Sequence, residues 1–226
     1  MPPSRLKPGN VHVWVVDLAT APATPDVLSP SEHARAERFR FAQDRRRFIA
    51  SHAALREILA TYTGRHPAAL EFMTLPHGKP ALLSGDLHFN LSHSGELALV
   101  ALAAGSELGV DIERIRAQVE MEAIARRFFA PSETETLLAY PEPEREPAFF
   151  RCWTRKEAYV KALGGGLTIS LSSFVVSLEP ARAELLSGVE PPWTLHSLDV
   201  HPGYCAALAV AGHPAEISLL RWPPNR

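Results

Sequence analysis

The expected order of strands and helices repeats on either side of Ala104–Gly105–Ser106, the weak break near the middle of the chain. Each side begins with an alternating, β-branched strand, continues with amphipathic helices and ends with further strands. A strand, then helices, then antiparallel strands is the order typical of an α+β domain. We therefore predict an α+β fold of two pseudo-symmetric halves packed side by side, residues 1–105 and residues 106–226.

The periodicity of apolar residues places the individual elements. In the first half it predicts strands at 11–17, 70–74, 88–90 and 97–103, a short basic helix at 32–41, and a longer helix from Asp44 to Gly64. In the second half it predicts strands at 108–113, 174–178, 193–200, 204–211 and 216–222, and helices at 120–129, 131–140 and 148–163.

Composition limits the kinds of partner. The chain has 226 residues, of which 46% are hydrophobic and 21% charged, as in an ordinary soluble protein. A formal net charge of −2 gives no global basic field for nucleic acid. Residues 1–8 lack the apolar run of a signal peptide, so none is expected, and the sequence contains no run of 18 apolar residues. Cys152 and Cys205 are expected to be reduced, buried thiols. We predict a cytoplasmic protein that binds neither nucleic acid nor membranes.

Two segments carry acidic and basic residues in a suggestive arrangement. In G-V-D-I-E, an expected strand, Asp111 and Glu113 project from one face because side chains alternate. In W-T-R-K-E-A-Y-V-K, an expected helix, Glu157 and Lys161 share a face at i and i+4. Taken alone, a D-x-E motif is often no more than two polar residues on one face of a strand, and an E-x-x-x-K pair is often a surface salt bridge. Together, three carboxylates and an ammonium suit Mg²⁺ or Mn²⁺ beside a phosphate ester.

Three further segments could bind an anion. His77–Pro80 is predicted to be a turn that presents Lys79. Residues 89–95, F-N-L-S-H-S-G, are expected to end a strand in a loop whose hydroxyl, imidazole and backbone N–H groups could cradle a phosphate. Arg45–Arg47 open the longer helix, where a solvated basic turn is the simpler interpretation.

Together these segments resemble the 4′-phosphopantetheinyl transferases of the Sfp type, which have two fused pseudo-symmetric halves. The resemblance runs from about residue 11 to residue 212. It rests on five motifs in the family's order: G-K-P at 78–80, F-N-L-S-H-S-G at 89–95, G-V-D-I-E at 109–113, R-F-F at 127–129 with Glu133, and W-x-x-K-E-A-x-x-K at 153–161.

The resemblance implies transfer of the phosphopantetheine arm of coenzyme A (CoA) to a serine of an acyl or peptidyl carrier protein, with release of 3′,5′-ADP. Asp111, Glu113 and Glu157 would hold one Mg²⁺ that also binds the CoA pyrophosphate. Glu157 would take the serine proton as general base, and Lys161 would stabilise the leaving phosphate. Lys156 faces elsewhere on the helix, and both a structural and a catalytic role remain open for it.

The same resemblance assigns a set of residues to CoA binding: Arg47, Lys79, Pro80, Ser92, His93 and Lys161. Within this set, Arg47 matches a contact of the 3′-phosphate. The chain departs from the best-known member of the family at Glu32 and Phe48, where the resemblance would lead us to expect a lysine and a threonine. Arg45 or Arg46 could substitute for them.

A carrier protein would dock where apolar surface meets the site. Ile115, Val119 and Met121 follow the D-x-E strand, and we expect them to be partly exposed, whereas Phe128 and Phe129 are expected in the core. Charge complementarity to an acidic carrier could come from three arginines: Arg114, Arg116 and Arg126.

Two alternatives remain open. A Mg²⁺-dependent phosphohydrolase could use the same carboxylates, but it would leave G-K-P and S-H-S-G without a purpose. A non-catalytic CoA-binding protein of this fold is the other alternative, and the intact carboxylates argue against it. Because one chain carries both halves of the site, we expect a monomer.

Overall fold

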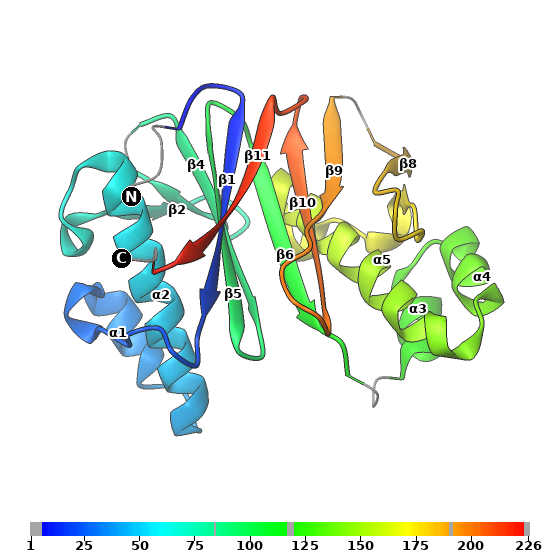
Figure 1. Ribbon diagram of the computed structural model, residues 1–226, viewed down its shortest axis with the longest axis horizontal. Coiled ribbons are helices and arrows are strands. Elements are labelled where there is room, and N and C mark those ends of the chain that lie inside the picture. Colours follow the sequence, from blue (N-terminus) through cyan, green and yellow to red (C-terminus); the bar gives the residue numbers. More distant parts are fainter. Residues whose placement is uncertain (1–5, 84, 117–119, 190–191, 224–226) are drawn as a thin grey trace.

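Two β-sheets stand face to face in the middle of the molecule, and each carries helices on its outer side (Figure 1). The structure is a computed structural model that describes residues 6–83, 85–116, 120–189 and 192–223. Its layers run helix, sheet, sheet, helix, as in two α+β units placed back to back. The predicted α+β fold is confirmed.

The first sheet has the strand order β11-β1-β5-β4. Its strands are β1 (Asn10–Asp17), β4 (Leu87–Ser94), β5 (Leu97–Ala104) and β11 (Glu216–Trp222). The helices α1 (Pro30–Ala36) and α2 (Ala42–Thr63) cover its outer face (Figure 1). β5 pairs antiparallel with both β1 and β4 and is buried along almost its whole length, which agrees with its apolar sequence.

The last strand crosses back to the first sheet. β11 pairs in parallel with β1 from Asn10 opposite Glu216 to Val16 opposite Trp222. The sequence predicts this strand but gives it to the second half of the chain. The division of the chain into two halves between residues 105 and 106 remains our prediction. β11 belongs to the second half by sequence and to the first sheet by its pairing with β1.

The second sheet has the order β6-β10-β9, all antiparallel. Its strands are β6 (Leu108–Arg114), β9 (Trp193–Ser197) and β10 (Tyr204–Ala211). Three helices lie outside it: α3 (Met121–Phe128), α4 (Pro131–Ala139) and α5 (Glu142–Leu163).

Two small hairpins and four short 3-10 turns complete the fold. The hairpins pair β2 (Phe72–Thr74) with β3 (Pro80–Leu82) and β7 (Val175–Val176) with β8 (Leu185–Ser187). The 3-10 turns are Pro25–Val27, Pro67–Ala69, Gly166–Thr168 and Leu171–Ser173.

Two helices differ from the sequence-based prediction by more than two residues at one end. α1 starts at Pro30 because Ser29 and Glu32 form a capping box, and it ends at Ala36 rather than at residue 41. α5 starts six residues earlier than predicted and contains Pro147. Pro147 is the sixth residue of α5 and lacks the N–H that would bond to the carbonyl of Pro143, which lies in the exposed first turn of the helix. By contrast, Gly64 ends α2 as predicted, in a left-handed conformation with φ 68°.

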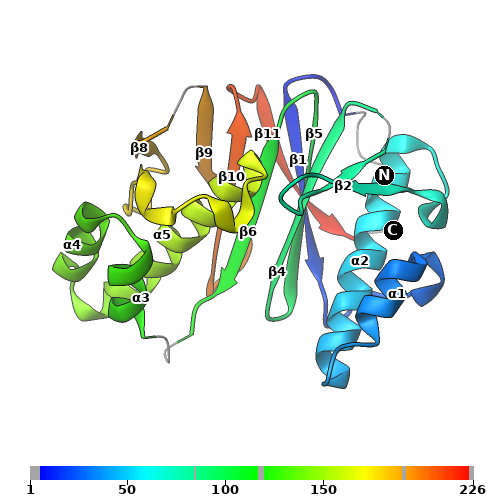
Figure 2. The same cartoon turned by 180° about the vertical axis from the view of Figure 1, so that it is seen from behind.

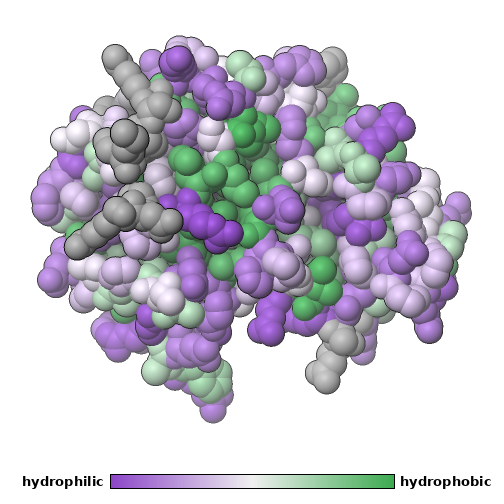
Figure 3. All heavy atoms as spheres, viewed as in Figure 1, coloured by the Kyte–Doolittle hydropathy of each residue, from purple (hydrophilic) through white to green (hydrophobic). Residues whose placement is uncertain are grey.

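Three buried apolar clusters hold the layers together. One lies between the two sheets, one between the first sheet and α2, and one between the second sheet and α5. Figure 3 shows apolar side chains gathered near the middle of the face where the two sheets meet. None of the helices in the described ranges has the length and apolar character to span a membrane.

Gly109 allows α5 to lie directly on β6. A Cβ atom at this position would stand 2.2 Å from Ala158 O and 2.2 Å from Ala162 N, both backbone atoms of α5. Backbone atoms cannot turn away as a flexible side chain can, so any larger residue would push the helix off the strand. The motif G-V-D-I-E therefore contains the residue that sets the spacing between its own strand and the E-x-x-x-K helix.

We expect Gly109→Ala to lower both stability and activity, since the added methyl displaces α5. Overpacking of this kind costs about 1–3 kcal/mol, and thermal unfolding would measure it. Gly105→Ala is the control, because Gly105 has φ +74° but a Cβ atom placed there would meet no atom within 4 Å. That variant should lose a similar ~1–2 kcal/mol from backbone strain and keep full activity. Full activity in Gly109→Ala would contradict the spacing role.

Candidate active site

β6 lies between β4 and α5, and these three elements bring the acidic and basic side chains together (Figure 2). Asp111 is buried in β6, and its Oδ1 accepts hydrogen bonds from Lys161 Nζ at 2.6 Å and Ser92 Oγ at 2.8 Å. Glu113, two residues along the strand, accepts a hydrogen bond from Ser94 Oγ at 2.7 Å. The predicted strand and helix therefore do meet, and β4 supplies hydroxyl groups to both carboxylates.

Negative charge is poorly compensated at this place. Burial raises the pKa of Asp111, Glu113 and Glu157. The charge of Asp111 further raises the pKa of both glutamates, while the Lys161 ammonium opposes the rise. Buried carboxylates that perturb one another in this way are typical of functional sites.

The chemistry of the three carboxylates suits a divalent cation, although their arrangement in this structure does not form a metal site. Asp111 Oδ2 is buried and has no hydrogen-bond partner, although an unsatisfied buried oxygen costs about 1–3 kcal/mol. Carboxylate oxygens are the ligands that Mg²⁺ and Mn²⁺ prefer. Within the described ranges, no group of three or more His, Cys, Asp or Glu side chains has the geometry to hold a metal ion. In this structure the positive charge next to Asp111 comes from the Lys161 ammonium and not from a metal ion.

The segment F-N-L-S-H-S-G is a strand for most of its length, where a loop is expected from the sequence. β4 extends through Ser94, and the turn follows at Gly95, which has φ 58°. Ser92 and Ser94 point toward β6, so His93 projects from the opposite face. The hydroxyls and the imidazole therefore do not line one common anion cradle.

His93 lies in a positive environment. Partial burial and then the charges of Lys161, Arg35 and Arg47 lower the pKa of this imidazole. Cations gathered around a neutral histidine suit an anionic ligand, which would offset their mutual repulsion. Arg47 itself pairs with Glu96, and Asp44 lies 3.4 Å from its guanidinium.

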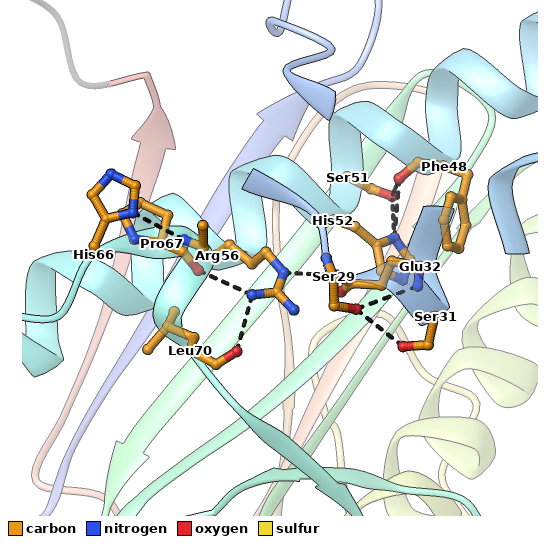
Figure 4. Close-up of polar contacts among 11 residues, drawn as sticks. Ser29, Ser31, Glu32, Phe48, Ser51, His52, Arg56, His66, Pro67 and Leu70 are labelled. Carbon is orange, nitrogen blue, oxygen red and sulfur yellow. Dashed lines mark hydrogen bonds and ion pairs between the residues drawn. The ribbon is translucent and has the colours of Figure 1, made fainter. Parts of the chain in front are cut away.

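A cavity of 820 Å³ opens beside β4, between the first two helices and the β2–β3 hairpin. Its polar wall is shown in Figure 4. The cavity is lined by apolar residues, among them Leu55, Leu70, Phe72 and Phe89, and by polar residues, among them Ser31, Glu32, Arg35 and His52. Its size lies within the range of small-molecule sites.

Glu32 is held in a buried ion pair. Its Oε2 accepts hydrogen bonds from Arg56 Nε and from the Ser29 backbone N–H, both at 2.7 Å (Figure 4). Arg56 also donates to the carbonyls of Pro67 and Leu70 at 2.9 and 3.0 Å. Glu32, at the position where a lysine was expected from the sequence resemblance, is therefore neutralised within the protein.

Phe48, the other departure from the family pattern, is part of a stack. Its ring centroid lies 3.9 Å from that of His52, and the Arg35 guanidinium lies 5.3 Å from the Phe48 centroid on the cavity side. Burial lowers the pKa of His52 to about 4, so this imidazole is neutral near pH 7. Of these three residues, only Arg35 brings positive charge to the cavity.

Lys79 ties the β2–β3 turn to the second half. Its ammonium donates to Glu107 Oε2 at 2.8 Å and to the carbonyls of Leu108 and Ala162 at 3.0 Å each. These contacts use all three N–H donors, so a contact with phosphate would replace one of them. Pro80, by contrast, is exposed and lines the cavity.

Lys156 is fully buried on the far side of α5. Its ammonium contacts Glu133 Oε2 at 2.8 Å and the carbonyls of Leu171 and Phe174 at 2.7 Å each. The second oxygen of Glu133 accepts the Val176 N–H at 2.7 Å. Of the two roles left open by the sequence, this arrangement supports the structural one for Lys156.

Comparisons with known proteins agree with this arrangement. The family model described as "4′-phosphopantetheinyl transferase superfamily" matches residues 107–209, and "4′-phosphopantetheinyl transferase, N-terminal" matches residues 14–106. The 4′-phosphopantetheinyl transferase HetI of Nostoc sp. is 39% identical over 211 residues, which cover 90% of this chain and 88% of that protein. The chain belongs to the 4′-phosphopantetheinyl transferase family. It is an enzyme of that class, as its sequence resemblance implies.

Two further transferases show the same breadth of similarity. The 4′-phosphopantetheinyl transferase psf-1 of Bacillus pumilus is 36% identical over 184 residues, covering 80% of this chain and 78% of that protein. The 4′-phosphopantetheinyl transferase Sfp of Bacillus subtilis is 31% identical over 190 residues, covering 83% of each chain. The similarity to these transferases spans both halves, including the strand and helix of the candidate site.

Two residues that lie at the candidate site of this transferase have no role in the sequence-based prediction. Ser94 contacts Glu113, and Gly109 sets the distance between β6 and α5. Alternation along β4 puts Ser94 on the same face as Ser92 and could have identified it. Nothing in the sequence indicates which backbone atoms approach Gly109.

The expected carrier surface of the transferase is only partly described. Ile115 and Met121 are half-buried and pack against the core of the second half, and Val119 lies outside the described residues. Phe129 is buried as predicted. Phe128 is 36% exposed, contrary to the prediction: it is the last residue of α3, and its ring stands edge-on against Trp153.

The raised pKa of Glu157 in the transferase leads to a pH-dependent stability prediction. Below about pH 4.3, Glu is protonated in the unfolded chain and also in the fold, so its burial is tolerated. As pH rises through the raised folded-state pKa, the fold must hold an ionised, repelled carboxylate and loses stability. Glu157→Gln should therefore raise the melting temperature of the metal-free protein at pH 8 more than at pH 5.

Melting curves in a chelator at both pH values would measure this difference. A gain of about 2–4 °C is expected for each kcal/mol of relieved repulsion. The matched control is Glu135→Gln, at an exposed position of α4, where no gain is expected. An equal gain at both pH values would contradict the assignment to Glu157.

Proposed function

We propose that this enzyme transfers the 4′-phosphopantetheine arm of CoA to a serine of an acyl or peptidyl carrier protein, releases 3′,5′-ADP and depends on Mg²⁺. The observation that carries the proposal is the meeting of Asp111, Glu113, Glu157 and Lys161, in which the charges of Asp111 and Lys161 shift the pKa of both glutamates. A ligand-sized cavity lies on the other face of β4, at Phe89 and Leu91. Membership of the transferase family supports the reaction class.

Asp111, Glu113 and Glu157 would hold the Mg²⁺, and Mn²⁺ would suit the same oxygen ligands. When bound, the cation would neutralise charge on the pyrophosphate of CoA. The orphaned Asp111 Oδ2 and the raised pKa values of the three carboxylates support this assignment.

Glu157 would accept the proton of the carrier serine. Its raised pKa makes it a stronger base than an ordinary glutamate, which suits proton transfer near neutral pH. In the reaction, a bond forms between the serine oxygen and the β-phosphorus of CoA, and the bond from that phosphorus to the bridging oxygen of the pyrophosphate breaks. Lys161, one helical turn from Glu157, would stabilise the charge that develops on the departing 3′,5′-ADP.

CoA would lie along the cavity with its phosphates toward His93. The positive environment of His93 supports a phosphate there, and Pro80 lines the space that a nucleotide would fill. Arg47, Lys79 and Ser92 remain proposed contacts. Each already has partners within the protein that CoA would have to replace.

One experiment tests the proposal against both alternatives. The protein is incubated with CoA, Mg²⁺ and an apo carrier protein, and the carrier is then weighed by mass spectrometry. A gain of one phosphopantetheine arm that disappears with a chelator is the expected result. Release of free phosphate without a mass gain would indicate a phosphohydrolase, and neither product would indicate a CoA-binding protein. Dephospho-CoA as a second substrate would show how far the 3′-phosphate contributes.

All residues assigned to the site belong to one chain, so we propose that the enzyme acts as a monomer. We further propose that it works in the cytoplasm, where CoA and carrier proteins would be available, and that neither nucleic acid nor a membrane takes part.

A further inference from the structure

The edge strands β4 and β6 of the two sheets lie next to each other (Figure 2). They are not paired in one sheet, and side chains of β4 join them instead. Three side chains of β4 accept hydrogen bonds from three backbone N–H groups of β6. The pairs are Asn90 with Val110 (2.9 Å), Ser92 with Ile112 (3.4 Å) and Ser94 with Arg114 (3.1 Å). We call these three pairs the side-chain ladder, because alternate residues of both strands form its rungs.

Two rungs of the side-chain ladder also hold carboxylates. Ser92 Oγ donates to Asp111 Oδ1 at 2.8 Å, and Ser94 Oγ donates to Glu113 Oε2 at 2.7 Å. A serine hydroxyl has one hydrogen to donate and two lone pairs to accept with. Each serine therefore accepts from the backbone of β6 and gives its only hydrogen to a carboxylate of the same strand.

Neither serine is free to donate to a phosphate. Ser92 Oγ accepts from Lys161 Nζ at 3.0 Å as well as from Ile112, so both its lone pairs and its hydrogen are in use. A hydrogen bond from Ser92 to a phosphate would release Asp111. The hydroxyl therefore orients a carboxylate, and the proposed contact of Ser92 with CoA would require it to give up one of these hydrogen bonds.

We propose that Ser92 and Ser94 are positioning residues of the transfer reaction. Each hydroxyl fixes one oxygen of a carboxylate and leaves the second oxygen for the cation. At Asp111 this division is visible, since Oδ1 carries the hydrogen bonds while the buried Oδ2 has no partner. The same hydroxyls also join the two sheets. The hydrogen bonds of Ser92 and Ser94 therefore determine both the distance between β4 and β6 and the orientation of the two carboxylates.

This inference rests on the proposed function, and Ser94 is the better residue for its test because Ser92 also contacts Lys161. Binding of Mn²⁺ is measured by electron paramagnetic resonance on the protein saturated with CoA, without carrier protein, so that no turnover is needed. Ser94→Ala should weaken Mn²⁺ binding about 10-fold to 100-fold, as loss of a group that orients a metal ligand does. Ser94→Thr keeps the hydroxyl and should restore binding.

Asn90→Ala is the matched control. It removes a rung of the side-chain ladder that, within the described residues, holds no carboxylate. Its melting temperature should fall while its Mn²⁺ affinity stays at the wild-type value. Unchanged Mn²⁺ binding in Ser94→Ala, or an equal loss in Asn90→Ala, would overturn the positioning role and leave the proposed function intact. A wild-type protein that binds no Mn²⁺ would overturn the metal site of the proposed function and this inference with it.

Discussion

Replacing Asp111 with asparagine is expected to lower kcat/KM about 100-fold to 1,000-fold, which corresponds to roughly 3–4 kcal/mol of lost transition-state stabilisation. Asp111 is buried, and its Oδ1 binds Ser92 and Lys161 while its Oδ2 has no partner. Asparagine has the same shape but no charge, so it keeps the packing and removes the negative ligand that a cation needs. Steady-state kinetics at saturating Mg²⁺ would measure the loss.

The fold should survive this change, because burial already disfavours the charged form of Asp111 and raises its pKa. A melting temperature within a few degrees of the wild-type value is therefore expected. Asp199→Asn makes the same chemical change at an exposed position of the second half and should leave turnover unchanged. Turnover near the wild-type rate in Asp111→Asn would rule out Asp111 as a metal ligand.

Two lysines of α5 should respond in opposite ways to the same substitution. Lys156→Met leaves Glu133 buried without its cation, and a broken buried ion pair typically costs about 3–5 kcal/mol. The melting temperature should fall by about 6–20 °C, with turnover near normal at temperatures where the variant is folded. Lys161→Met, whose side chain is 30% exposed, should lose less stability than Lys156→Met, because Asp111 can take up a proton when the ammonium is removed, but it should lose about 100-fold to 1,000-fold in kcat.

A double variant separates the effect of charge from that of packing. Adding Glu133→Gln to Lys156→Met removes the isolated buried carboxylate and should recover part of the lost stability. Thermal unfolding and kinetics on the wild type, both lysine variants and the double variant would measure both properties. If Lys156→Met were fully folded at the assay temperature yet inactive, Lys156 would have a direct part in the reaction.

Residues that depend on local periodicity were predictable from the sequence. Alternation placed Asp111 and Glu113 on one face of a strand, and the four-residue spacing placed Glu157 and Lys161 on one face of a helix. The conformation at Gly64, which ends α2, follows from the lack of a Cβ and was also predictable.

Features that depend on how separate elements meet were not predictable. The partner of Lys156 is 23 residues away in a different helix, and Ser92 and Ser94 reach β6 only because two sheet edges adjoin there. The pattern could show that Lys156 faces away from Lys161, but not that Glu133 would face it. Likewise, the apolar alternation at 216–222 predicts a strand and gives no information about which sheet accepts it.

The position of β11 has a consequence for the order in which the chain folds during synthesis. Until residues 216–222 leave the ribosome, one edge of β1 has no partner, and the first sheet lacks its last strand. An unpaired apolar edge is prone to pair with other chains. The N-terminal half should thus reach its final stability only after residues 216–222 have been synthesised, and the two halves are expected to unfold together as one cooperative unit.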